Sequence, residues 1–443
     1  MKRGFYTIMA AQFFSSLADN ALFIAGFALI LQLEGPTWMP PMIKWAFALA
    51  YVVLAAFVGA LADAKPKGRV MFATNCLKIV GCAIIFFYDM FKIPGAREFW
   101  VIFGGFLVVG VGAAMYSPAK YGILTELLPP DQLVKGNGWI EGLTVLSIIL
   151  GQVLGGLLIS PAVAAKLLTI DMPYFDTGID TAPEAAIVII SIFYLAAAIF
   201  NLWIPDTGAR YPKQASHPVR LVVDFGRCVA TLWKDKLGQI SLAVTTLFWG
   251  AGATLQLILI EWGKTQLNLR LDQVSILMGV ASMGTIVGAI IAGRWITLQR
   301  ALFVLPFGVA LGVVISVLPF THSMPMVYVL LIGAGALIGF FVVPMNALLQ
   351  HRGHVLLSAG HSIAVQNFNE QLCILAMLAV YSVLLSMNIH INIVIWIFGA
   401  LVLVLMAAIM YWNHLNHLQN PNLDRIIGMK KGESDSHFVA GPH

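Results

Sequence analysis

Charge is scarce in this sequence. Only 11% of its 443 residues are Asp, Glu, Lys or Arg, whereas 59% are hydrophobic. Soluble domains carry about a quarter charged residues, so this composition excludes an ordinary water-exposed globule. A basic patch for nucleic acid is missing too, because the 26 Lys and Arg residues are scattered and the net charge is only +5. We therefore expect a membrane protein that binds no nucleic acid.

Disulfide frameworks and catalytic motifs are also missing. No CxxC pair occurs among the four cysteines Cys76, Cys82, Cys228 and Cys373. The sequence contains no HExxH or GxSxG motif, and no histidine is followed by an aspartate five positions later. Gly263-Lys264-Thr265 resembles the end of a phosphate loop, but Ile258 stands where that motif needs glycine. We predict that the protein is not an enzyme and binds no metal or cofactor.

Long apolar runs recur along the whole chain instead. A helix needs about 20 apolar residues to cross about 30 Å of hydrocarbon, and twelve segments are long enough. The first six are Phe5–Leu33, Ile43–Ala62, Val70–Lys92, Phe99–Ala119, Gly138–Ser160 and Glu184–Ile204. The second six are Leu237–Ile260, Asp272–Gly293, Ala301–Phe320, Met326–Leu349, Ser358–Ser386 and Ile391–Trp412. We predict an all-α integral membrane protein of twelve transmembrane helices, the first of which is too long to be a signal sequence.

A long polar connection divides these helices into two sets of six. We predict an N-terminal bundle over 1–204, a cytoplasmic linker over 205–236, a C-terminal bundle over 237–412 and a polar cytoplasmic tail over 413–443. Apolar and basic residues alternate in the linker in a way that suits an amphipathic helix on the inner leaflet. Nineteen of the 26 Lys and Arg residues fall on one side of the helices and six on the other. The positive-inside rule then places both termini in the cytoplasm.

The two halves carry corresponding features, which indicates two pseudo-symmetric bundles. Tyr116-Ser117-Pro118-Ala119-Lys120 ends helix four, and Val343-Pro344-Met345-Asn346 occurs in helix ten. The run Gly59-x-Leu61-x-Asp63 is followed by a basic turn and Arg69, and a degenerate copy lies at Gly288–Arg294. Glycine permits close helix approach, the aspartate is an anion at a helix end, and the arginine opens the next helix. We predict a conformational latch formed by Gly59, Asp63, Arg69 and, one turn into helix five, Glu141.

Ionisable residues inside the spans are few, and each costs about 2.5–3.5 kcal/mol at the bilayer centre unless it faces a cavity or a partner. Asp19 lies midway along helix one, and Glu370 lies near the middle of helix eleven. We predict a substrate-binding cavity lined by Asp19, Asn20, Lys78, Lys120, Gln366, Asn367 and Glu370. The alternative for Asp19 is a buried ion pair with Lys78 or Lys120 that only fixes helix packing.

Assembled in this way, the chain resembles the bacterial lysophospholipid transporters, one branch of the major facilitator superfamily. The resemblance rests on Ala11-Gln12-Phe13 through Asp19-Asn20-Ala21-Leu22, Tyr116 through Leu124, Phe248-Trp249-Gly250-Ala251-Gly252, Phe340 through Pro344 with Asn346 through Gln350, and Ala364-Val365-Gln366-Asn367. It implies a monomeric flippase that moves lysophospholipid, chiefly 2-acyl-glycerophosphoethanolamine, from the outer to the inner leaflet of the bacterial inner membrane. A partner acyltransferase on the cytoplasmic side would then re-acylate the lipid.

The resemblance also implies roles for the buried charges. Asp19 and Glu370 would meet an ammonium, and Lys120 or Lys78 would meet a phosphate. Members of the family are expected to carry an arginine at the position of Gln256, where it could pair with the helix-one aspartate. This chain departs from that pattern, which leaves the partner of Asp19 and the headgroup preference open.

Two other functions remain open on the sequence. A proton-coupled efflux carrier for drugs or small amphiphiles would share the fold, but such carriers tend to have a Gly-Pro element in helix five, where this chain has Gly151-Gln152. A membrane acyltransferase or phosphatidyltransferase would need a nucleophile or a metal cluster on a cytoplasmic loop. We find neither in the sequence, and uptake of labelled lysophosphatidylethanolamine by proteoliposomes would separate a lysolipid transporter from both.

Overall fold

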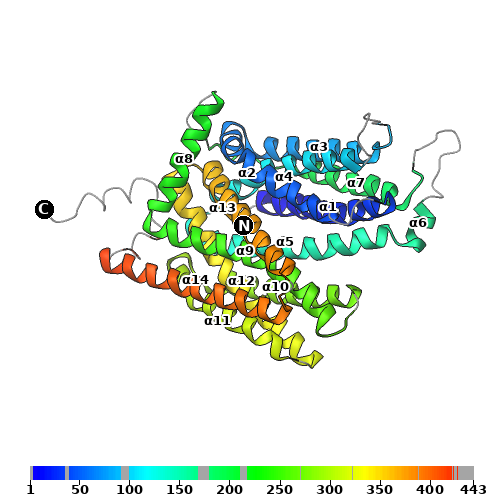
Figure 1. Ribbon diagram of the computed structural model, residues 1–443. Helices are drawn as coiled ribbons and strands as arrows, with labels where there is room; N and C mark the ends of the chain where they lie inside the picture. The colour runs from blue at the N-terminus through cyan, green and yellow to red at the C-terminus, as the bar shows by residue number, and fades with distance from the viewer. Residues whose placement is uncertain are drawn as a thin grey trace. The chain divides into compact units, whose positions relative to one another are not determined.

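The computed structural model describes residues 3–34, 39–90, 99–167, 179–209, 217–269, 271–321, 323–387, 389–421, 423 and 427 (Figure 1). Within these ranges the chain forms helices and no strands. Twelve of the helical segments described are long and apolar enough to cross a membrane, which confirms the predicted fold class and helix count. The tail predicted over 413–443 lies mostly outside the described residues.

The helices follow one another closely along the chain. Before the linker they are α1 (Arg3–Gln32), α2 (Met39–Ala64), α3 (Lys67–Phe86), α4 (Phe99–Leu127), α5 (Pro130–Leu158), α6 (Pro161–Leu167) and α7 (Ala182–Leu202). The linker contains α8 (Pro218–Lys234), where the amphipathic pattern predicts a helix. After it come α9 (Lys236–Thr265), α10 (Leu271–Trp295), η1 (Leu298–Val304), α11 (Leu305–Val317), η2 (Leu318–Phe320), α12 (Met324–Leu356), α13 (Ala359–Ser386) and α14 (Ile391–Gln419).

Several helices extend beyond their predicted bounds, among them α4, α5 and α12. α4 continues from the predicted end at Ala119 to Leu127 across Pro118, and α12 continues to Leu356 across Pro344. Proline removes one backbone donor, but neighbouring helices and local adjustments satisfy the freed carbonyl in membrane helices. α5 begins at Pro130 rather than at residue 138, because proline suits the first turn of a helix. Polar residues assigned to loops from hydropathy therefore lie on helices.

Contacts group the chain into two compact units. The N-terminal unit comprises Met1–Lys120 and Leu146–Arg210, and the C-terminal unit comprises Tyr121–Val145 and Tyr211–His443. α4 and α5 therefore each contribute residues to both units. The predicted bundle boundaries at 204 and 237 stay predictions.

In the N-terminal unit, α7 packs against α1 and α3, so that these three helices lie side by side (Figure 1). Their apolar faces, together with α4, form a core that includes Leu22, Leu29, Ile85, Phe106 and Ile190. The second half of α5 also packs on α1, where Gly151 and Gly155 face the backbone at Leu17 and Ala21. Small residues allow this close approach of two helix backbones.

In the C-terminal unit, α10 and α12 make the most extensive helix contact, and α11 packs on α14. Gly284 and Gly288 of α10 face the carbonyl groups of Ile332 and Ala336 on α12. The contact is mutual, because two glycines of α12, Gly335 and Gly339, face backbone carbonyl groups of α10. The small-xxx-small spacing in both helices thus produces the packing that it predicts.

We predict that Gly288→Val lowers the melting temperature of the purified protein in detergent. A β-carbon at this position would meet the Ala336 carbonyl, and overpacking of this kind costs about 1–3 kcal/mol. Gly279→Val on the same helix is the matched control, since a β-carbon there meets no atom within 4 Å. Equal melting temperatures for the two variants would contradict the close packing of α10 and α12.

Candidate functional site

A buried ion pair joins three helices of the N-terminal unit. The Lys78 Nζ atom on α3 lies 2.8 Å from Oδ1 and 2.9 Å from Oδ2 of Asp19 on α1. Tyr194 on α7 donates its hydroxyl to Asp19 Oδ1 at 2.6 Å. The lysine side chain is 1% exposed, whereas 21% of the aspartate side chain remains exposed. Of the two cations predicted as partners for Asp19, the structure pairs it with Lys78.

Polar and aromatic side chains continue this cluster around the lysine. Lys78 Nζ donates to Ser15 Oγ at 3.1 Å, and Ser15 Oγ donates to Asn75 Oδ1 at 2.8 Å. The rings of Tyr116 and Tyr194 lie 5.2 and 5.4 Å from Lys78 Nζ, within the range of a cation–π interaction. We call these residues, with Asp19, the Lys78 cluster.

Helical spacing could have found part of this cluster in the sequence. Ser15 lies four residues before Asp19, and Asn75 lies three residues before Lys78, so each pair shares a helix face. Tyr116 gave no such signal. It reaches the lysine because Gly112, one turn earlier on α4, lacks a side chain, and a β-carbon there would lie 2.7 Å from Lys78 Cγ.

Two predicted site residues of the same unit are engaged elsewhere. Asn20 Nδ2 donates to the backbone oxygen of Ser16 at 2.8 Å, and its β-carbon faces Gly151 of α5. This arrangement gives Asn20 a packing contact. Lys120 is half-buried on α4, two residues after Pro118. Gln256, the residue that departs from the family pattern, is half-buried on α9 in the other unit.

A chain of buried side chains joins α5, α12 and α13 in the C-terminal unit. Asn346 Nδ2 donates to Glu141 Oε1 at 3.1 Å. Gln366 Nε2 donates to Asn346 Oδ1 at 2.9 Å and to Glu370 Oε1 at 2.7 Å. The structure thus links Glu141, predicted as part of a latch, with the predicted binding residues Gln366 and Glu370. Asn367, on the same helix, is buried as well.

One turn away, the same helices α5 and α12 make a second polar contact. Asn137 Nδ2 donates to Gln350 Oε1 at 2.9 Å, and Gln350 Nε2 donates back to Asn137 Oδ1 at 2.9 Å. Both side chains are buried. The Asn137–Gln350 and Glu141–Asn346 contacts form two rungs, which we call the α5–α12 ladder. Beside it Gly138 approaches the α10 backbone closely, since a β-carbon there would lie 2.9 Å from the Ala289 oxygen.

The other predicted latch residues lie at the turn between α2 and α3. Asp63 is buried and forms an ion pair at 3.6 Å with Lys67, which also donates to the Ala62 carbonyl at 3.3 Å. Gly59 is buried in α2, whereas Arg69 is exposed. The turn therefore pairs its aspartate with a lysine of the basic turn.

The C-terminal unit also contains a buried bidentate ion pair that the sequence did not indicate. The predicted span Met326–Leu349 ends before Arg352, whereas α12 continues to Leu356. Arg352 Nη2 and Nε lie 2.6 and 3.1 Å from the two carboxylate oxygens of Asp235. Asp235 also caps α9, since its Oδ2 accepts a hydrogen bond from Gly238 N at 2.8 Å. One carboxylate thus ties the end of α12 to the junction of α8 and α9.

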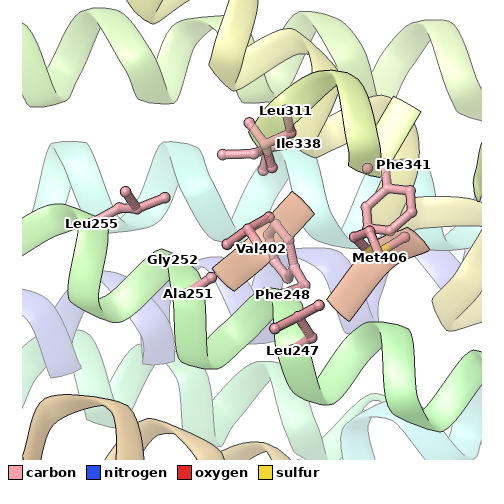
Figure 2. Close-up of a pocket in the computed structure, with 11 residues that line it drawn as sticks. Leu247, Phe248, Ala251, Gly252, Leu255, Leu311, Ile338, Phe341, Val402 and Met406 are labelled. Atoms are coloured by element: carbon pink, nitrogen blue, oxygen red, sulfur yellow. The ribbon is translucent and has the colours of Figure 1, made fainter. Parts of the chain in front are cut away.

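An apolar pocket lies among α9, α11, α12 and α14 in the C-terminal unit (Figure 2). Its volume is about 20 Å³, which is room for about one water molecule. Its lining is Leu247, Phe248, Ala251, Gly252, Leu255, Gly308, Leu311, Ile338, Phe341, Val402 and Met406. No charged side chain is among them, so the pocket suits hydrocarbon and could not hold a headgroup.

The two polar clusters differ in what they can do chemically. The Lys78 cluster holds opposite charges that a charged ligand could separate and pair anew. The α5–α12 ladder consists largely of amides, which exchange partners without moving a charge. No group of three or more His, Cys, Asp or Glu side chains that could hold a metal ion occurs within the described ranges.

Comparison with known proteins identifies the family. The family model described as Major Facilitator Superfamily matches residues 8–375. The chain is 40% identical over 390 residues to "Lysophospholipid transporter LplT" of Yersinia enterocolitica, covering 88% of this chain and 89% of that protein. The protein of the same name from Yersinia pestis is 40% identical over 389 residues, which are 88% of each chain.

Solved structures share the fold at low sequence identity. A bacterial homologue of the iron transporter ferroportin, in an outward-facing state, has a TM-score of 0.70 at 14% identity and covers 93% of this chain and 100% of its own. The transporter FucP, in an outward conformation, has a TM-score of 0.67 at 13% identity and covers 93% of this chain and 98% of its own. The chain is thus a multi-pass membrane protein that belongs to the Major Facilitator Superfamily and, within it, to the family of the bacterial lysophospholipid transporters.

Proposed function

We propose that this protein is a flippase that moves lysophospholipid, chiefly 2-acyl-glycerophosphoethanolamine, from the outer to the inner leaflet of the bacterial inner membrane. The names of its relatives support the class of cargo. The excess of Lys and Arg in one set of loops supports a cytoplasmic location of both termini. We further propose that the protein works as a monomer and delivers its cargo to an acyltransferase on the cytoplasmic side.

One observation carries the choice of headgroup. Both carboxylate oxygens of Asp19 accept hydrogen bonds from Lys78 Nζ, a primary ammonium on an alkyl chain. The ethanolamine headgroup ends in the same chemical group, so its ammonium can donate the same hydrogen bonds to Asp19 in place of the lysine. The exposed part of the Asp19 side chain gives such a ligand a point of approach. A quaternary choline headgroup has no N–H to donate and would be held less well.

The acyl chain needs an apolar environment, and the side chains that line the small pocket among α9, α11, α12 and α14 are all of this kind (Figure 2). Gln366, Asn367 and Glu370 are proposed to contact the cargo from the C-terminal unit, with Glu370 as a second carboxylate for the ammonium. These roles rest on the residue types and their burial.

We predict that proteoliposomes containing the protein take up labelled lysophosphatidylethanolamine, and that Asp19→Asn lowers the initial rate at least about tenfold. Loss of a charge-assisted hydrogen bond of this kind removes about 1.5–3 kcal/mol of binding free energy. Asp224→Asn is the matched control, because Asp224 forms an exposed pair with Arg227 on α8. Uptake unaffected by Asp19→Asn would remove the carboxylate from the binding site.

The same vesicles test the competing function. A proton-coupled efflux carrier would move lipophilic dyes in response to a pH gradient and would not take up lysolipid. That pattern would overturn the proposed function. Uptake of the choline lipid at the rate of the ethanolamine lipid would overturn the headgroup assignment alone.

A double-mutant cycle tests whether Asp19 and Lys78 form a unit. We predict that Asp19→Asn and Lys78→Gln each lower stability by about 3–5 kcal/mol, since each leaves one charge buried without its partner. The double variant should recover most of the loss. The exposed Asp224–Arg227 pair is the control and should contribute about 0–1 kcal/mol. Thermal unfolding in detergent measures all variants, and additive losses would contradict the coupling.

We propose that the α5–α12 ladder and the turn with Gly59, Asp63 and Arg69 act as conformational latches. We predict that Gln350→Leu, which leaves the buried Asn137 amide without its partner, raises hydrogen exchange across residues 130–145. Bound lysophosphatidylethanolamine should also alter exchange there. Ser316→Ala, on α11, removes a bond to the Gly312 carbonyl and is the control. Unchanged exchange in both experiments would refute the latch role of the ladder.

A further inference from the structure

Two hydrogen-bond donors beside Lys78 are buried without partners. The Asn75 Nδ2 and Tyr116 Oη atoms have no hydrogen-bond partner among the described residues. Asn75 is fully buried and Tyr116 is 5% exposed. Buried polar groups in folded proteins are nearly always hydrogen-bonded, so two unpartnered donors near one cation require an explanation.

Both residues lie close to the lysine. Asn75 lies one helical turn before Lys78 on α3, and its Oδ1 is held by Ser15, which in turn accepts from Lys78. The hydrogen bond from Ser15 fixes the Asn75 side chain by its oxygen and leaves its amide nitrogen without a partner among the described residues. Tyr116 places its ring 5.2 Å from Lys78 Nζ from the neighbouring α4. An ammonium, an amide and a phenol from two helices thus belong to one buried cluster.

This set of groups matches the chemistry of a phosphodiester. A phosphate presents several oxygen atoms that accept hydrogen bonds and one negative charge that favours a cation. We propose that Lys78, Asn75 and Tyr116 form the phosphate subsite for a zwitterionic lysophospholipid, whose headgroup enters by dividing the Asp19–Lys78 ion pair. The inference rests on the proposed function and adds two specificity-determining residues to it.

The ion pair explains why the ligand is a zwitterion. Lys78 Nζ already donates to both oxygens of Asp19 and to Ser15, so all three of its protons are used. An anion alone could bind the lysine only by leaving Asp19 without its cation. A cation alone would leave Lys78 unpaired in the same way. A zwitterion supplies one charge for each side chain, so that one buried pair becomes two and no charge is left uncompensated.

Other contacts in the Lys78 cluster hold Asp19 and Lys78 when a ligand separates them. Tyr194 on α7 donates to Asp19 Oδ1 and holds the carboxylate in place when the lysine leaves it. Ser15 and Tyr116 contact Lys78. In this proposal the ammonium of the headgroup takes the place of the lysine between α1 and α7, and the phosphate is bound by Lys78 and Asn75 of α3 and Tyr116 of α4.

The test uses the full-length protein in proteoliposomes with Tyr116→Phe, which removes one hydroxyl that has no hydrogen-bond partner among the described residues. Three unlabelled lipids compete with labelled lysophosphatidylethanolamine: the same lipid, lysophosphatidylglycerol and a monoacylglycerol that lacks phosphate. In the wild type we expect the zwitterion to compete best and the monoacylglycerol worst. Tyr116→Phe should weaken competition by lysophosphatidylethanolamine about tenfold, or about 1.4 kcal/mol, and leave competition by monoacylglycerol unchanged.

Two further variants complete the design. Asn75→Ala should also weaken competition by lysophosphatidylethanolamine and leave competition by monoacylglycerol unchanged. Tyr51→Phe is the matched control, since its hydroxyl donates at 3.0 Å to the Ala113 carbonyl. It should keep the wild-type preference among all three lipids. A purely structural role for Tyr116 would instead weaken all competitors equally or lower the melting temperature.

The outcomes separate the two proposals. If the wild type takes up no lysolipid, the proposed function fails, and the subsite fails with it. If the wild type takes up lysolipid but Tyr116→Phe and Asn75→Ala keep the full preference for phosphate, only the subsite is overturned. Equal competition by lysophosphatidylethanolamine and lysophosphatidylglycerol would overturn the proposal that the headgroup divides the Asp19–Lys78 ion pair.

Discussion

The hydrocarbon of the bilayer cannot solvate a charge, so an ionisable group inside it needs a cavity or a partner within the protein. Buried Glu141 and Glu370 accept hydrogen bonds from amides, and buried or largely buried ion pairs join Asp19–Lys78, Asp63–Lys67 and Arg352–Asp235. The last two join helix ends within a single unit, where they fix a turn and cap a helix. The first joins three helices and keeps part of its carboxylate exposed, which makes it the pair that a ligand can reach.

The two units share two helices, α4 and α5. The division falls between Lys120 and Tyr121 in α4 and between Val145 and Leu146 in α5. Pro118 lies two residues before the first of these points and removes one hydrogen bond from the α4 backbone. Prolines are the most frequent cause of kinks in long helices, so α4 is weakest next to the point where it passes from one unit to the other.

The sequence alone supports the number of helices and the choice of Asp19, because both follow from hydropathy and the scarcity of charge. It leaves the partner of Asp19 open, since Lys78 and Lys120 satisfy the same pattern and only the packing of α3 against α7 selects between them. Hydropathy also ends helices at the last apolar residue. For that reason it assigned Arg352 to a loop, although the helix continues until its guanidinium is buried against Asp235. Tyr116 and Tyr194 gave no signal, because aromatic residues are common throughout the spans.

The different chemistry of the two polar clusters fits their proposed tasks. A neutral amide pair such as Asn137–Gln350 contributes about 0.5–1.5 kcal/mol for each hydrogen bond, and its partners can be replaced by water at little net cost. Such contacts suit a latch that opens and closes in every cycle. Separating Asp19 from Lys78 without replacement would cost several kcal/mol, so that bond opens readily only when a ligand supplies both charges. The ion pair at the proposed binding site therefore makes its opening depend on cargo. The ladder, in which Glu141 stands beside three amide side chains, can exchange its partners more easily.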